Sequence, residues 1–215
     1  GVRAIAVSPD GDAYVGGTFA SAGGIANSAI IAKWNGFHGF WSTIPTSFTG
    51  PIGLNISAIT IAPNSNVYFA GTFTSTSHGT NLSYYDGSAC YPVGAAVFNQ
   101  QLFSLYFDSN GGLYVGGRFT NLGGITNVSR IAKWNGSSWQ ALGTGLNDLA
   151  SVIVGQSGKI YVGGQFTIAG GLTLTDRVAV WSNGAWQPLD IDLPGTATVY
   201  AVLPASDGSL YIGGG

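Results

Sequence analysis

The stretch YVGGRFTNLGG, from Tyr114 to Gly124, decides how this 215-residue chain is organised. Nearly the same phrase occurs as YVGGTFASAGG from Tyr14, YFAGTFTSTSHG from Tyr68 and YVGGQFTIAGG from Tyr161, and a shortened YIGGG begins at Tyr211. In each copy, a glycine pair or an Ala-Gly pair follows a predicted strand that contains an aromatic residue. The chain is therefore built from internal repeats, and these repeats predict its fold.

The spacing of the repeats is typical of a β-propeller. Successive tyrosines of the phrase are 54, 46, 47 and 50 residues apart, a length that suits a blade of four strands. We expect an all-β fold, a β-propeller of four-stranded antiparallel blades of about 46–54 residues, with four complete repeats plus a half. These form a single propeller domain or a portion of one, with repeats at residues 2–54, 55–100, 101–147 and 148–198 and a partial repeat at 199–215.

Four strands can be placed within each repeat. The opening strands are expected at residues 3–8, 57–62, 102–107, 150–155 and 200–204, and most of them lead into turns such as Asp10-Gly11 and Asn110-Gly111. Dipeptides of this kind are strong hairpin signals because they accept positive φ. The return strand then ends at the glycine pair, where neighbouring blades are expected to leave no space for a Cβ atom. Ten residues before each marker tyrosine only small residues occur, which suggests crowded opening strands: Ala4, Ala58, Ser104, Ser151 and Ala201.

Aromatic residues mark the third and fourth strands. The third strand is expected at residues 30–36, 81–87, 130–136 and 177–184, and the fourth contains Trp41, Cys90, Trp139 and Trp186. Cys90 thus replaces a core tryptophan, which gives the only cysteine a packing role. We expect two sets of aromatic residues to be largely buried between blades: Trp34, Tyr85, Trp134 and Trp181 on third strands, and Tyr14, Tyr68, Tyr114 and Tyr161 on return strands.

These residues carry a family resemblance. A strand that ends in a glycine pair, an aromatic residue followed by Asn or Asp, and a spaced tryptophan resemble the kelch-type propeller repeat. The pattern YVGGxFTxAGG…IAxWNGxxWxxLG is more similar still to bacterial and viral propeller repeats and to those of fungal cell-polarity surface proteins of the Rax2 type. The resemblance covers essentially the whole chain and implies the propeller architecture, whereas propellers perform many unrelated functions.

Composition excludes several classes of protein. Charged residues make up 7% of the chain against about 25% in an average domain, and the formal net charge is −2. Without a basic patch, nucleic acid is not an expected partner, and no apolar run reaches the roughly 20 residues that span a bilayer. A surface poor in charge and rich in Gly, Ser, Thr and Asn suggests an extracellular, cell-surface or virus-particle location.

The inventory of reactive side chains argues against an enzyme. All nine acidic residues are aspartates, and the two histidines, His38 and His78, show no metal-ligand spacing. The aspartates of hairpin turns, such as Asp12 and Asp108, are expected to accept backbone hydrogen bonds rather than to bind calcium. No nucleophile–base–orienter set can be assembled. We therefore expect no catalytic residues, no bound metal and no cofactor.

Loop aromatics are the remaining indication of function. The first repeat is a few residues longer than most of the others and contains FHGFWSTIPTSFTGP from Phe37 to Pro51. The candidate contacts with a ligand or partner are Phe37, His38, Phe40, Phe48 and His78. The aromatic rings can stack on sugars, or they can pack beneath the longer loop or against another subunit.

Two functions remain open. The first is a non-enzymatic structural or adhesive propeller of an extracellular surface, filament or virus particle, whose partners are other protein subunits. The alternative is a glycan-binding, lectin-like propeller, which should repeat its ligand-binding residues in each blade. The residues after the glycine pair instead vary between repeats: Thr18, Thr72, Arg118 and Gln165.

The repeat also predicts the number of strands. Five opening hairpins and four closing pairs give eighteen strands, which four-stranded blades cannot divide evenly. Since both ends of the chain carry an opening hairpin, neither completes a blade begun by the other. We therefore expect the 215 residues to be an excerpt of a longer chain and part of a larger propeller.

Overall fold

A computed structural model describes residues 1–26, 28–46, 48, 53–75, 79–95, 97–173, 177–189, 191, 193 and 197–215. These residues contain eighteen β-strands, as the repeat predicts. Across the described ranges, no helix has the length and apolarity needed to cross a bilayer.

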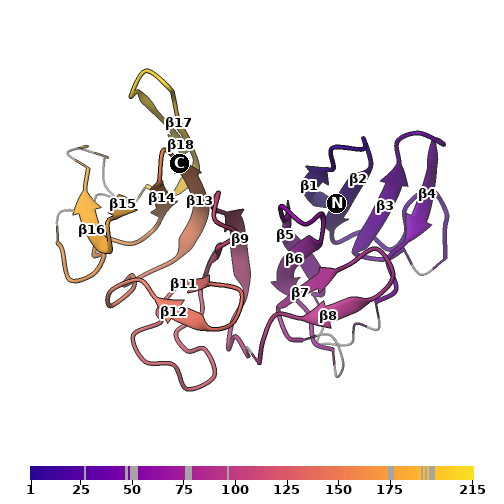
Figure 1. Cartoon of the computed structure of the whole chain (residues 1–215), viewed down its shortest axis with the longest axis horizontal. Helices are drawn as coiled ribbons and strands as arrows, with labels where there is room; N and C mark the ends of the chain where they lie inside the picture. Colours follow the sequence, from indigo (N-terminus) through magenta and orange to yellow (C-terminus); the bar gives the residue numbers. More distant parts are fainter. Residues whose placement is uncertain are drawn as a thin grey trace. The chain divides into compact units, whose positions relative to one another are not determined.

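The strands form four four-stranded antiparallel sheets and one hairpin, each in simple sequence order (Figure 1). Blade 1 contains β1 (Val2–Val7), β2 (Ala13–Gly17), β3 (Ile31–Asn35) and β4 (Phe40–Thr43), and blade 2 contains β5 (Asn55–Ile61), β6 (Val67–Thr72), β7 (Leu82–Tyr85) and β8 (Cys90–Pro92). Blade 3 contains β9 (Leu102–Phe107), β10 (Leu113–Gly117), β11 (Ile131–Trp134) and β12 (Trp139–Ala141). Blade 4 contains β13 (Ala150–Gln156), β14 (Lys159–Gly164), β15 (Val178–Ser182) and β16 (Ala185–Pro188), and the half-blade contains β17 (Val199–Pro204) and β18 (Leu210–Gly214).

The chain divides into two compact units, Gly1–Leu102 and Phe103–Gly215. In the first unit β5 packs against β1 and β2, and the core includes Ile31, Ile56 and Phe69. In the second unit β13 packs against β10, β17 packs against β13 and β14, and the core between blades 3 and 4 includes Ile131 and Phe166. Within each unit, the opening strand of one blade thus covers the preceding blade.

The glycine pair at the end of β14 shows why the repeat needs two glycines. A Cβ atom on Gly163 would lie 2.6 Å from Val199 Cγ1 of the half-blade, and a Cβ on Gly164 would collide with the carbonyl oxygen of Leu149 in its own blade. The first glycine therefore admits the next opening strand, as the sequence predicts, whereas the second permits close approach within the hairpin.

A β-bulge near the start of the opening strand links adjacent elements. The register shifts between Ile56 and Ala58 in β5 and between Ala150 and Val152 in β13. The residues at these two bulges are Ser57 and Ser151. The Ser57 hydroxyl donates to the carbonyl of Leu102, and the Ser151 hydroxyl donates to the carbonyl of Val199. Bulges re-aim side chains in this way, so each serine ties its blade to the residue that begins the next opening strand.

The prediction of small residues at one position of the opening strands is wrong in blade 4. Ala4, Ala58 and Ala201 pair with Gly16, Ala70 and Gly213, but the equivalent partner of Gly163 is Val152. The cause is a shorter hairpin, because Tyr14 pairs with Ala6, eight residues earlier, whereas Tyr161 pairs with Val154, seven residues earlier. Counting back from the tyrosine therefore selects Ser151, one residue too early.

The aromatic positions are only partly as predicted. Tyr14 and Tyr114 are buried, with exposed fractions of 7% and 5%. The other predicted residues are half-buried: Tyr68, Tyr161, Trp34, Tyr85, Trp134 and Trp181. Cys90 pairs with Tyr85 as Trp139 pairs with Trp134, which confirms the predicted alignment of the cysteine with the tryptophans.

Candidate functional site

The turn between β3 and β4 presents an exposed aromatic group. Phe37 is 88% exposed and Phe40 is 52% exposed, and the ring of His38 lies 4.8 Å and 5.9 Å from their rings. We call Phe37, His38 and Phe40 the aromatic turn. The corresponding turn of blade 3, NGSSW from Asn135, is two residues shorter and contains serines instead.

Polar contacts fix the backbone of the aromatic turn. The amide of His38 donates to Asn35 Oδ1 at 2.7 Å, and the amide of Gly39 donates to the Asn35 carbonyl at 2.9 Å. The amide of Gly36 donates to Asp12 Oδ1 at 3.1 Å. The exposed rings therefore extend from a hydrogen-bonded hairpin end.

The other predicted contact residues do not join this group. Phe48 packs against the core of the first unit, with its ring 4.5 Å from that of Phe73 and 5.7 Å from that of Phe69. Phe48 is half-buried there, which favours the packing alternative for this residue, and its role as a contact residue stays a prediction. His78 lies outside the described residues.

A lysine–aspartate pair recurs in blades 1 and 3. Lys33 lies 2.6 Å from Asp12, and Lys133 lies 2.9 Å from Asp108. The two lysines pair with Tyr14 and Tyr114 across the strands, with their ammonium groups 5.7 Å and 4.8 Å from the ring centres. The aspartates come from different sequence positions, since Asp12 lies two residues before its tyrosine and Asp108 lies six before.

Asp108 is the better anchored of the two aspartates. Its Oδ1 accepts hydrogen bonds from the amides of Asn110 at 2.9 Å and Gly112 at 2.8 Å, which confirms the predicted turn role of this carboxylate. Burial opposes its ionisation, but the hydrogen bonds from Lys133 and from the two amides prevail and lower the pKa of Asp108. Burial likewise opposes charge on Lys133, but the favourable interactions with Asp108 and Tyr114 together outweigh it and raise the pKa of Lys133.

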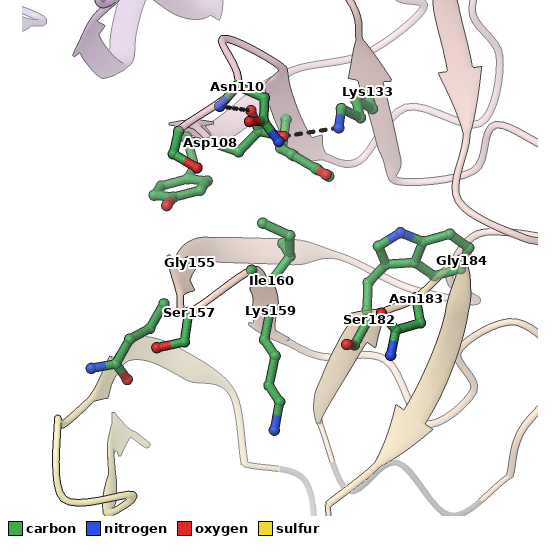
Figure 2. A pocket seen from close by; sticks show the side chains of 16 residues that line it. Asp108, Asn110, Lys133, Gly155, Ser157, Lys159, Ile160, Ser182, Asn183 and Gly184 are labelled. Atoms are coloured by element: carbon green, nitrogen blue, oxygen red, sulfur yellow. Dashed lines mark hydrogen bonds and ion pairs between the residues drawn. The ribbon is translucent and has the colours of Figure 1, made fainter.

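The Asp108–Lys133 pair lines a pocket of about 450 Å³ between blades 3 and 4. Three turns surround it, those that join β9 to β10, β13 to β14 and β15 to β16 (Figure 2). Its lining includes the side chains of Tyr106, Asp108, Asn110, Tyr114, Lys133, Ser157, Ile160, Trp181, Ser182 and Asn183. Figure 2 shows Ile160 directed toward the Asp108–Lys133 pair, whereas the neighbouring Lys159 extends away from it.

This pocket was not predicted from the sequence. Its residues come from two blades and three turns, and among them only Asp108 offers a carboxylate ligand. The feature that could have revealed it is the combination of Tyr106 with Gly155, because a Cβ atom on Gly155 would collide with the phenol of Tyr106. Among the described residues, no three His, Cys or Asp side chains gather as they would around a metal ion.

Comparison with known proteins places these features on a known architecture. No family model matches the chain. Polarized growth protein L1 of Phoma sp. is 31% identical over 93 residues, which are 41% of this chain and 7% of that protein. The chain therefore spans a small part of this curated relative.

Solved structures are similar over almost the whole chain. Virginiamycin B lyase from Staphylococcus aureus has a TM-score of 0.59 at 13% identity, over 99% of this chain and 62% of the lyase. A gluconolactonase from Xanthomonas campestris has a TM-score of 0.63 at 14% identity, over 100% of this chain and 69% of that protein. PorZ, a surface component of the type-IX secretion system of Porphyromonas gingivalis, has a TM-score of 0.63 at 12% identity, over 98% of this chain and 30% of PorZ. At these identities the likeness concerns the fold alone, and it establishes the chain as a β-propeller of four-stranded blades.

Proposed function

We propose that this chain is a non-enzymatic propeller of an extracellular surface or particle, and that it makes protein–protein contacts through the aromatic turn of blade 1. The observation that carries the proposal is the 88% exposure of Phe37 on a hydrogen-bonded turn. Aromatic residues, Phe included, are enriched in protein interfaces relative to the rest of the surface. Because hydrogen bonds hold the backbone of the turn, binding costs less backbone entropy than it would for an unbonded loop.

The scarcity of charge supports the same role. Charged residues make up 7% of the chain, and interface cores are depleted in charge and enriched in aromatic residues. PorZ, a bacterial surface component, shares the fold, and the similarity to a polarized growth protein covers 93 residues. The YVGG repeat adds its resemblance to the Rax2-type surface proteins. Together these features favour a location outside the cell.

The reactive groups support a non-enzymatic role. Burial raises the pKa of the Cys90 thiol to about 12, which leaves it without nucleophilic thiolate at neutral pH. The ring of His38 contacts Phe37 and Phe40. We expect the purified chain to show no lyase activity toward quinupristin, the compound bound by an inactive virginiamycin B lyase of similar fold, and no lactonase activity toward gluconolactone. Turnover of either compound, abolished by His38→Ala, would contradict the non-enzymatic role.

A site-specific cross-link tests the partner surface. The photoreactive residue benzoylphenylalanine replaces Phe37 in one variant and Ser137, in the corresponding turn of blade 3, in a matched control. We expect irradiation on the native surface to give a discrete protein adduct from position 37, which Phe40→Ser removes, and none from position 137. Equal adducts from both positions, or none from position 37, would refute the aromatic turn as the contact surface.

A further inference from the structure

The pocket between blades 3 and 4 has the composition of a binding site for an uncharged polar ligand. Asp108 and Lys133 neutralise each other across 2.9 Å. Lys159 also lines the pocket, but its side chain extends away from this pair (Figure 2). A charged ligand would lose its hydration there without meeting an unpaired opposite charge. The ammonium group of Lys133 carries three donors; one is used by Asp108, and the group lies 4.8 Å from the centre of the Tyr114 ring. The Asp108–Lys133 pair therefore offers hydrogen bonds without net charge.

Aromatic side chains form the apolar part of the same pocket. Tyr106, Tyr114 and Trp181 line it together with the buried Ile160. Tyrosine and tryptophan combine an apolar face with a polar edge. A pyranose has the complementary surface, with apolar C–H groups on its face and hydroxyl groups around its edge. The volume of about 450 Å³ lies in the range of pockets that hold small ligands.

A reciprocal exchange of large and small residues distinguishes this pocket from the same place in the first unit. Gly155 stands where blade 2 has Ile61, because Gly155 pairs with Ile160, next to Tyr161, as Ile61 pairs with Val67, next to Tyr68. Tyr106 stands where blade 1 has Ala6, because the amide of Asp108 donates to the Gly112 carbonyl as the amide of Ser8 donates to the Asp12 carbonyl. In the first unit Ile61 packs into the core. Between blades 3 and 4 the glycine instead leaves room for a phenol hydroxyl at the pocket wall.

We propose that this pocket binds a neutral mono- or disaccharide, with the sugar ring against Tyr106 and Trp181 and its hydroxyls bound by Asp108, Lys133 and Asn183. The site goes beyond the protein contacts assigned to the aromatic turn, and it lies in a different unit of the chain. Binding at this pocket and adhesion through Phe37 are therefore separable by mutation.

A glycan array with neutral and acidic saccharides, probed with the 215-residue chain, tests the ligand class. The best neutral binder is then titrated as its methyl glycoside against ¹⁵N-labelled chain. We expect saturable shifts at the amides of residues 155–160 and 182–184. Gly155→Ala, which pushes the Tyr106 phenol into the pocket, and Asp108→Asn, which removes the charge, should each weaken binding at least tenfold.

Matched controls keep the proposal falsifiable. Lys159→Ala, which alters a side chain that points away, should leave the affinity within twofold, and circular dichroism melting should show that all three variants fold. Binding of acidic saccharides alone, with loss on Lys159→Ala, would overturn the neutral ligand. Absence of any neutral binder on the array, or affinity unchanged in both Gly155→Ala and Asp108→Asn, would overturn the site.

Discussion

The indole nitrogen of Trp186 donates a buried hydrogen bond of 2.8 Å to the carbonyl of Leu142, 44 residues earlier in the chain. The bond fastens the fourth strand of blade 4 to the segment that leaves blade 3. The ring of Trp186 also packs 5.4 Å from that of Trp181. A single side chain thus connects two adjacent blades of the second unit.

Trp186→Phe should lower the free energy of unfolding by about 1 to 3 kcal/mol, because the phenyl ring leaves the Leu142 carbonyl buried without a donor. Urea denaturation followed by circular dichroism measures the change. Trp41→Phe is the matched control in blade 1, where the ring is half-buried, and its effect should be smaller. Equal losses in both variants would show that the hydrogen bond contributes nothing measurable.

Gly163 and Gly213 offer a second comparison between equivalent positions. Gly163 is the first glycine of YVGG in blade 4, and Gly213 is the first glycine of YIGG in the half-blade. A Cβ on Gly163 would meet Val199 at 2.6 Å and Val202 at 3.0 Å, whereas a Cβ on Gly213 would meet only Ala201 at 3.6 Å. Gly163→Ala should therefore destabilise the chain by about 1 to 3 kcal/mol through overpacking, while Gly213→Ala should be neutral or stabilise it by up to about 1 kcal/mol. Thermal unfolding compares the two, and a larger loss in Gly213→Ala would contradict the packing argument.

Cys90 should be inert in the folded chain. Its side chain is 4% exposed, and burial raises its pKa to about 12. Because the thiolate is the reactive form, Ellman's reagent at pH 8 should release no colour from the native chain over an hour. In guanidinium chloride the same chain should titrate one thiol. Rapid reaction without denaturant would show that β8 opens readily.

The sequence predicts the strands well because each strand is specified locally. The tyrosine before the glycine pair, the turn dipeptides and the spaced tryptophans each mark a strand end, and all eighteen strands occur in the expected order. The equivalence of Cys90 with Trp139 follows from the same local alignment. Burial was less predictable, because the exposure of residues such as Trp134 depends on what the adjacent blade contributes.

The candidate site was less predictable because it depends on contacts between repeats. Phe37, His38 and Phe40 could be chosen from an insertion in one turn, but Phe48, in the same segment, packs into the core. In blade 3 the partner of the lysine is Asp108, whereas in blade 1 it is Asp12. Asp12 lies four positions later in its repeat than Asp108 does. A repeat alignment assigns Gly112 to that position and therefore conceals the equivalence.

The Asp108–Lys133 ion pair should make stability depend on acid pH in a defined window. The pKa of Asp108 is lowered from its ordinary value of 3.8 in the folded chain, so the folded state binds fewer protons there than the unfolded state. The stabilisation is present above pH 3.8 and is lost as the pH falls through the folded-state pKa.

Asp108→Asn should cost about 0.5 to 1 kcal/mol at pH 7, because solvent screens a partly exposed pair. The difference from the unmutated chain should vanish below the folded-state pKa, where both side chains are neutral. Urea denaturation at pH 7 and at successively lower pH measures this, and a difference that stays constant throughout the acid series would assign the effect to the turn hydrogen bonds instead of the charge.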